Sequence, residues 1–132
     1  MAGTREPIAR RRGTEMPKFM LLIYGDEKAR PEPGSPALQE EGAKYETFTK
    51  SIVESGNFLD GDPFLPTATA KTVQVRKGKT KTSSGPADTA RDQLQAYYKV
   101  QADSETEALE MAARIPGALH GTIEVRPVVM FE

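Results

Sequence analysis

The sequence of 132 residues contains no cysteine. This absence excludes a disulfide framework, a thiolate metal site and a cysteine nucleophile. Long apolar runs are also missing, because the longest, Phe19 to Tyr24, is far too short to span a bilayer. Neither sign of charge dominates: 18 Lys and Arg residues stand against 19 Asp and Glu residues, so the composition gives no sign of a nucleic-acid partner. We therefore expect a soluble, cytoplasmic protein with no nucleic-acid or membrane partner.

The length and the 37% hydrophobic content fit one small two-layer domain. The N-terminal residues carry four arginines and almost no apolar pattern. They lack the hydrophobic region of a signal peptide and show no amphipathic period, which favours a disordered tail over a targeting peptide or a basic anchoring arm. The sequence thus predicts a tail over residues 1–16, with Met16 as a candidate natural start, and a folded domain over residues 17–132.

The stretch from Leu94 to Met130 has the clearest local signals, and it predicts a strand, a helix and a second strand. Its two ends, residues 94–102 and 122–130, alternate between apolar and polar side chains. Between them, Ser104 and Glu107 form a capping box, which places the helix start at Ser104, and Pro116 ends the helix. The last strand is expected at a sheet edge or with a bulge, because Pro127 lacks an N–H group.

The N-terminal half begins with a predicted strand and a long helix. Residues 18–25 are apolar on both faces, which is typical of a strand that is buried on both sides. Ser35 is a suitable N-cap for an amphipathic helix of about 20 residues, and Gly56 suits its left-handed C-terminal cap.

The middle of the chain predicts a connection and a hairpin. Asn57 to Pro66 is dense in turn residues and is interpreted as a link from the helix to the next strand. Residues 69–76 alternate as that strand, which turns at Lys77-Gly78 into a short polar arm over residues 79–83. Ser84 to Asp92 is read as a loop.

This order of elements predicts an α+β fold of the ferredoxin-like split βαβ type with an extra β-hairpin arm. Two helices cover only one face of such a sheet, so we expect a second copy of the chain to cover the other face and form a homodimer. The residues expected in the shared space are a mixture of polar, charged and aromatic groups that is typical of a wet ligand cavity. They are Gln74, Arg76, Tyr97, Lys99, Glu124 and Arg126.

Five segments, in their order and spacing, resemble the YCII-related proteins, and specifically the branch named for a DGPF motif. The segments read KFMLLIYGDE, YETFTKSIVESG, KTVQVRKGK, QLQAYYKVQADSETEALEMAARIP and HGTIEVRPV. The resemblance implies a dimeric α+β barrel. It implies less about function, since most members are uncharacterised. The wider superfamily includes isomerases, mono-oxygenases and dehalogenating lyases, and the DGPF branch is often associated with sigma factors of the extracytoplasmic-function type.

The sequence departs from that branch in the name-giving loop. Where the family reads DGPF, this chain has Ser84-Gly85-Pro86-Ala87, so the aspartate and the phenylalanine are lost. The His-Asp pair proposed as catalytic in YciI-like members has no clear match either. Asp26 and His120 are the nearest residues by type.

His120 is the only side chain here whose unperturbed pKa lies near neutrality, and it falls between a helix end and a strand. It is a candidate acid or base, and the alternative is a structural role as a helix cap. Tyr97 is a candidate proton donor or stacking surface, with packing as the alternative. Asp60 and Asp62 flank Gly61 and are explained by turn chemistry rather than by a metal site.

Our leading hypothesis is a homodimer that binds a small organic molecule in a cavity at the dimer interface, with lyase- or isomerase-type acid–base chemistry as one option and without a cofactor. The rival is a non-catalytic ligand sensor or a partner of a sigma factor. The candidate catalytic residues are His120, Asp26 and Tyr97, and the candidate substrate-binding residues are Glu124, Arg126, Arg76, Lys99 and Tyr24.

Overall fold

The computed structural model describes residues 16–131, and the predicted tail over residues 1–15 lies outside them. Met16, which the prediction also assigned to the tail, is only 1% exposed and packs with the domain. The order of elements is β1 (Lys18–Asp26), α1 (Pro36–Glu54), β2 (Phe58–Pro63), β3 (Lys71–Arg76), β4 (Lys79–Ser84), β5 (Asp92–Gln101), α2 (Glu105–Arg114) and β6 (Thr122–Pro127). Three short 3₁₀ helices join them: η2 (Glu27–Ala29), η3 (Thr67–Thr69) and η4 (Pro116–Leu119).

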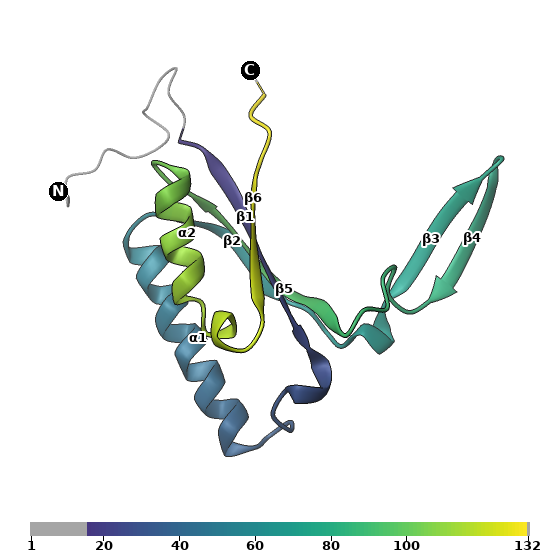
Figure 1. Cartoon of the computed structure of the whole chain (residues 1–132), viewed down its shortest axis with the longest axis horizontal. Coiled ribbons are helices and arrows are strands. Elements are labelled where there is room, and N and C mark those ends of the chain that lie inside the picture. The colour runs from purple at the N-terminus through teal and green to yellow at the C-terminus, as the bar shows by residue number, and fades with distance from the viewer. Residues whose placement is uncertain (1–15, 132) are drawn as a thin grey trace.

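The strands form two separate antiparallel sheets. The larger has four strands in the order β2-β5-β1-β6, and the smaller is the β3–β4 hairpin. Both helices lie against one face of the larger sheet, while the hairpin projects away on the other side of the molecule (Figure 1). The prediction of a ferredoxin-like α+β fold with a hairpin arm is confirmed. Among the described residues, no helix is long and apolar enough to cross a membrane.

The helix ends follow their predicted caps. The Ser35 hydroxyl accepts the Leu38 N–H at 3.1 Å, and the Ser104 hydroxyl accepts the Glu107 N–H at 3.2 Å. Gly56 has φ of +82°, the left-handed conformation that a glycine adopts without a Cβ penalty after a helix. Local side-chain chemistry therefore sets where both helices begin.

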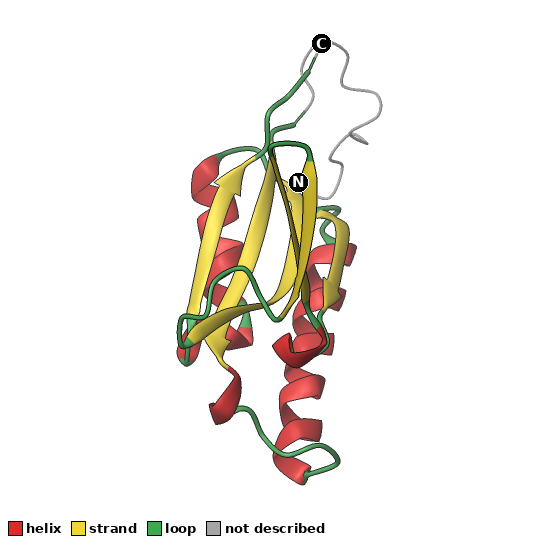
Figure 2. Cartoon of the chain, turned by 90° about the vertical axis from the view of Figure 1, so that its right-hand side faces the viewer, coloured by secondary structure: helices red, strands yellow, loops and turns green. Residues whose placement is uncertain are grey.

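The core lies between the helices and the sheet. Leu21 of β1 and Val100 of β5 are fully buried, as is Ile52 of α1. The sequence predicted that β1 is buried on both faces, and in the single chain this is wrong. Phe19, Leu21 and Ile23 face the helices and are buried, whereas the side chains that alternate with them are half-exposed. In Figure 2, which looks onto the side of the molecule away from α1 and α2, neither of these two helices lies in front of the larger sheet.

The strand that pairs with β5 at the edge of the larger sheet is β2, and not the alternating strand that the sequence predicted over residues 69–76. The connection read from Asn57 to Pro66 contains β2, which pairs with β5, and the alternating residues 71–76 pair with β4 alone. Asn57 explains the difference, because it is 3% exposed and its Nδ2 donates to the Gln101 carbonyl at 2.8 Å. Gln101 returns two bonds, from its N–H to the Asn57 carbonyl at 2.9 Å and from its Nε2 to the Gly56 carbonyl at 3.0 Å. These bonds start the β2–β5 pairing.

β6 lies at an edge of the larger sheet, as Pro127 predicted. The strand ends at Pro127 and does not continue to Met130. Beyond it, Val129 and Phe131 are exposed.

Candidate functional site

A cavity of about 690 Å³ lies between α1 and the end of the larger sheet at which β1 ends and β5 begins. This volume lies within the range of small-molecule sites. The cavity is on the helix-covered side of the sheet and is formed by a single chain. The cavity that the sequence predicted was expected on the opposite side, between two copies of the sheet.

The inner wall of the cavity is aromatic and aliphatic. Tyr98 is 8% exposed, and its ring meets Phe48 and Phe58 edge to face at centroid distances of 5.3 and 6.3 Å. Its hydroxyl shares a hydrogen bond of 2.6 Å with the Thr49 hydroxyl. Burial raises the pKa of Tyr98, and the bond to Thr49 lowers it in part. A fixed aromatic wall of this kind suits the apolar body of a ligand.

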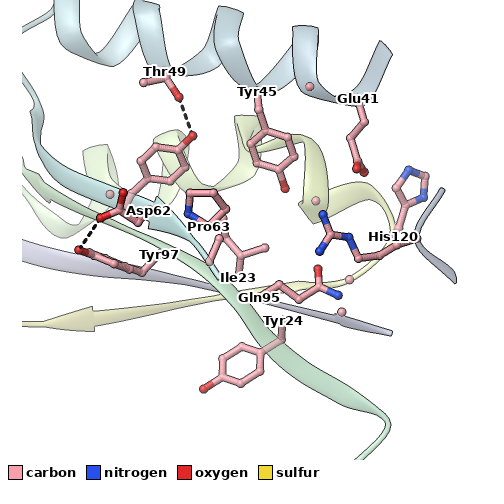
Figure 3. A pocket seen from close by; sticks show the side chains of 18 of the residues that line it. Ile23, Tyr24, Glu41, Tyr45, Thr49, Asp62, Pro63, Gln95, Tyr97 and His120 are labelled. Carbon is pink, nitrogen blue, oxygen red and sulfur yellow. Dashed lines mark hydrogen bonds between the residues drawn. The ribbon is translucent and has the colours of Figure 1, made fainter. Parts of the chain in front are cut away.

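Polar side chains from three elements gather at the other end. Glu41 and Tyr45 reach from α1 into the cavity, Gln95 faces them from β5, and His120 lies at the rim (Figure 3). Arg30, which follows η2, also lines this end. None of the hydrogen bonds or ion pairs within the described chain involves the side chains of Glu41, His120 or Arg30, so these groups are available to a ligand.

Gln95 owes its position to a bulge. In the β1–β5 pairing, Ile23 lies opposite Ala96 and Tyr24 lies opposite Leu94, so Gln95 is the extra residue on β5. A bulge redirects the side chain of the extra residue, and bulges are frequent beside active sites. Strict alternation would turn the Gln95 side chain toward the open face of the sheet, and the bulge gives it a place in the cavity wall.

Tyr45 lies against η4, the 3₁₀ helix that directly precedes His120. Gly117 makes this approach possible, because a Cβ there would lie 2.6 Å from the Tyr45 hydroxyl oxygen. Burial raises the pKa of Tyr45, a backbone hydrogen bond from Gly117 lowers it, and the nearby Glu41 carboxylate raises it again. The phenol therefore keeps its proton at neutral pH and can serve as a hydrogen-bond donor to a ligand.

Tyr97 belongs to a second polar group at the β2 side of the cavity. Its hydroxyl donates to Asp60 at 2.9 Å and lies 3.5 Å from an Asp62 oxygen. The hydrogen bond to Asp60 is the largest cause of a raised pKa at Tyr97, followed by desolvation and by the charges of the two carboxylates. Among the described residues, no group of three or more His, Asp or Glu side chains is arranged to hold a metal ion.

The three candidate catalytic residues, His120, Asp26 and Tyr97, all line the cavity. Two of them already have partners. The Asp26 carboxylate accepts the Lys28 N–H at 3.0 Å and caps η2, and the Tyr97 hydroxyl is bonded to Asp60. The exposed His120 donates its backbone N–H to the Gly117 carbonyl at 3.2 Å, while its ring remains at the rim.

The five candidate substrate-binding residues are spread over three places. Tyr24 lines the cavity, although Figure 3 shows its ring on the far side of the strand from Tyr45. Glu124 and Arg126 form an ion pair of 3.3 Å with each other on β6. Neither they nor Lys99 line the cavity, and Arg76 lies on the β3–β4 hairpin.

Sequence reasoning missed Glu41, Arg30 and Gln95. The signal for Glu41 was available, because it lies four residues before Tyr45 and eight before Thr49 on one face of the predicted helix. Arg30 and Gln95 carried no such signal, since a loop and a bulge place them.

Comparison with known proteins gives a match to the YCII-related domain over residues 17–132. An uncharacterised protein of Rhizobium meliloti (strain 1021) is 25% identical over 116 residues, which cover 86% of this chain and 94% of that protein. The match extends over every helix and strand described above.

Proposed function

The chain belongs to the YCII-related domain family, and from this premise we propose that it binds a small organic molecule in the cavity between α1 and the sheet. The observation that carries the proposal is the cavity of about 690 Å³, with one aromatic wall and an end where polar side chains converge. That combination of an apolar body and a few polar groups is typical of small-molecule sites. The ligand expected from it has a compact apolar or aromatic body and a polar head.

The polar end also supports acid–base chemistry as the reaction class. The His120 imidazole is a side chain of the type that most often serves as a general acid or base, and the Glu41 carboxylate lies on the facing helix (Figure 3). We assign the role of the carboxylate in the site to Glu41 rather than to Asp26, because the Asp26 carboxylate caps η2. In this proposal His120 transfers the proton, Glu41 and Arg30 orient the polar head, and the protonated Tyr45 donates a hydrogen bond.

Thermal unfolding with a panel of small compounds tests the binding step. Benzoate, benzylamine, phenol and cyclohexanone present different heads on bodies that fit the cavity. A ligand at a hundred times its dissociation constant stabilises the folded chain by about 2.7 kcal/mol, which is a clear shift in the melting temperature. Gly42→Leu fills the cavity from α1, where a Cβ meets nothing within 4 Å, and should abolish the shift.

Ala43→Leu is the matched control, since Ala43 is an exposed residue of the same helix that does not line the cavity. If a compound raises the melting temperature of Gly42→Leu and Ala43→Leu equally, it binds outside the cavity. For compounds that bind, product formation is then compared between wild type and His120→Ala. A loss on the order of 10²-fold or more is expected for a general acid or base. Binding without turnover would refute the chemistry and leave the sensor alternative.

A further inference from the structure

The side chains that line the cavity between α1 and the sheet are unequal in charge. Among the described residues, Arg30 is the only Lys or Arg side chain in the lining, whereas four carboxylates line it. The carboxylates are those of Asp26, Glu41, Glu46 and Asp62. A cleft lined mainly by one sign of charge focuses the electric field and concentrates ligands of the opposite sign. The cavity is therefore expected to attract cations.

Glu41 is the carboxylate best placed to bind a charged group. It is half-buried, whereas Glu46 and Asp62 are exposed. Within the described part of the chain, its carboxylate makes no hydrogen bond or ion pair, while the Asp26 carboxylate caps η2. A charge that is partly shielded from water interacts more strongly with an opposite charge than an exposed one does. Glu41 is therefore the expected anionic partner of a ligand.

Arg30 does not balance these carboxylates. It is exposed to water, where an ion pair contributes little. Its charge is also shared with Glu27, which does not line the cavity. Hydrogen bonds from Thr67 lower the pKa of Glu27, and the charge of Arg30 lowers it in smaller part, so Arg30 and Glu27 are neighbours. An anionic ligand would thus meet one shared cation and several carboxylates.

All four tyrosines of the chain line the same cavity. They are Tyr24, Tyr45, Tyr97 and Tyr98. The face of a phenol ring attracts cations, and ammonium groups are often bound in this way. Tyr45 points from α1 into the same space as Glu41 (Figure 3). Burial is the main cause of the raised pKa of Tyr45, and the charge of Glu41 adds to it, so the phenol and the carboxylate are neighbours.

On the basis of the proposed function, in which this cavity binds a small molecule, we infer that the ligand is an organic amine. It binds as its ammonium ion between the Glu41 carboxylate and the Tyr45 ring, and its apolar body lies on the wall that Tyr98 and Phe58 form. The Tyr45 hydroxyl donates to an oxygen atom of the ligand, because an ammonium group cannot accept a hydrogen bond. The expected class is an amine with a hydroxyl or carbonyl oxygen near its nitrogen.

Three compounds that differ in one group test the charge of the ligand. All have a phenyl ring on a carbon that carries a hydroxyl group, and they end in an ammonium, a methyl or a carboxylate group. They are 2-amino-1-phenylethanol, 1-phenyl-1-propanol and mandelate. Isothermal titration calorimetry with the full-length protein at neutral pH gives each dissociation constant. We expect the amine to bind about tenfold or more tightly than the alcohol, and mandelate to bind most weakly.

Two neighbouring glutamates of α1 provide a matched pair of variants. Glu41→Gln and Glu40→Gln each remove one charge and keep the shape of the side chain, but Glu40 is exposed and does not line the cavity. Glu41→Gln should raise the dissociation constant of the amine about tenfold and leave that of the alcohol within about twofold. Glu40→Gln should leave both within about twofold. A variant that merely loosens the fold would weaken both compounds.

Substitutions of Tyr45 test the contribution of its ring. Tyr45→Phe keeps the ring and should leave the ratio of the two dissociation constants unchanged, while both compounds lose the hydrogen bond from the hydroxyl. Tyr45→Leu removes the ring and should lower the ratio, because the cation then loses its aromatic contact. Circular dichroism of each variant verifies the fold.

Three results would overturn the inference and leave the proposed function intact. One is a wild type that binds 1-phenyl-1-propanol or mandelate more tightly than the amine. Another is an amine that binds Glu41→Gln as tightly as it binds the wild type. The third is an amine that still binds Gly42→Leu, in which the cavity is filled, while other compounds no longer do. If none of these compounds and none of the panel above binds, the proposed function fails together with the inference.

Discussion

β2 and β3 follow each other in the chain and became strands for different reasons. β2 contains Asp60, Gly61, Asp62 and Pro63, all of which are depleted in strands, yet it belongs to the larger sheet. β3 alternates like a good strand, yet it pairs only with β4. The comparison shows that an alternating pattern predicts an extended strand, whereas contacts with buried neighbours decide which sheet that strand joins. Phe58, Asn57 and Gly61 supply those contacts for β2.

The largest expected effect comes from removing the side chain that anchors β2. Phe58 packs on the core and on the Tyr98 ring, so Phe58→Ala should lower the free energy of unfolding by about 3 kcal/mol. Val73→Ala on β3 should change it by less than about 0.5 kcal/mol when the chain is monomeric. Urea unfolding at low protein concentration measures both. Equal losses would show that β3 is also packed by its own chain.

A smaller effect is expected from the close approach of β2 to β5. A Cβ on Gly61 would lie 2.9 Å from the Tyr97 carbonyl oxygen and from Tyr98 Cδ1, so Gly61→Ala should cost about 1–3 kcal/mol. Gly42→Ala in α1 meets no neighbour within 4 Å and should stabilise the chain by about 0.5–1 kcal/mol. The two shifts in melting temperature should have opposite signs. A stabilising Gly61→Ala would mean that β2 does not approach β5 so closely.

The smallest effect concerns η3, which separates β2 from β3. Two hydrogen bonds from Thr67 hold the pKa of Glu27 below its usual value. The bond from the Thr67 hydroxyl has the larger effect, and the bond from its backbone N–H has the smaller. A lowered folded-state pKa stabilises the chain above the unfolded-state pKa, and this contribution is lost as the pH falls through the folded-state pKa. Thr67→Val should therefore cost up to about 1 kcal/mol at neutral pH, because Glu27 is partly exposed to solvent.

The cost of Thr67→Val should fade as the pH drops below the folded-state pKa of Glu27. Chemical denaturation at a series of pH values measures this difference. Thr80→Val on the arm is the control, since Thr80 has no carboxylate partner on the opposite strand, where it faces Val75. A cost for Thr67→Val that does not change with pH would show that the threonine acts by packing alone.

The sequence predicted part of the candidate site and missed the rest for identifiable reasons. His120, Asp26 and Tyr97 were chosen by residue type, and all three line the cavity. Alternation placed Tyr97 on the same sheet face as Lys99, Glu124 and Arg126. It could not predict that the cavity lies on the helix-covered face of the sheet. Helical spacing from Tyr45 indicates Glu41. No local pattern reveals that Gln95 is the bulged residue of β5, since a bulge is defined by pairing with β1.

The sequence by itself determined the helix limits and the turn at Lys77-Gly78, because capping and turn chemistry act over a few residues. Lys77 and Gly78 have φ of +52° and +76°, as a tight hairpin requires. Only the tertiary structure decided which strand joins β5, on which face of the sheet the cavity lies, and that the β3–β4 arm stands apart. These features depend on contacts between residues far apart in the chain, and local patterns do not encode such contacts.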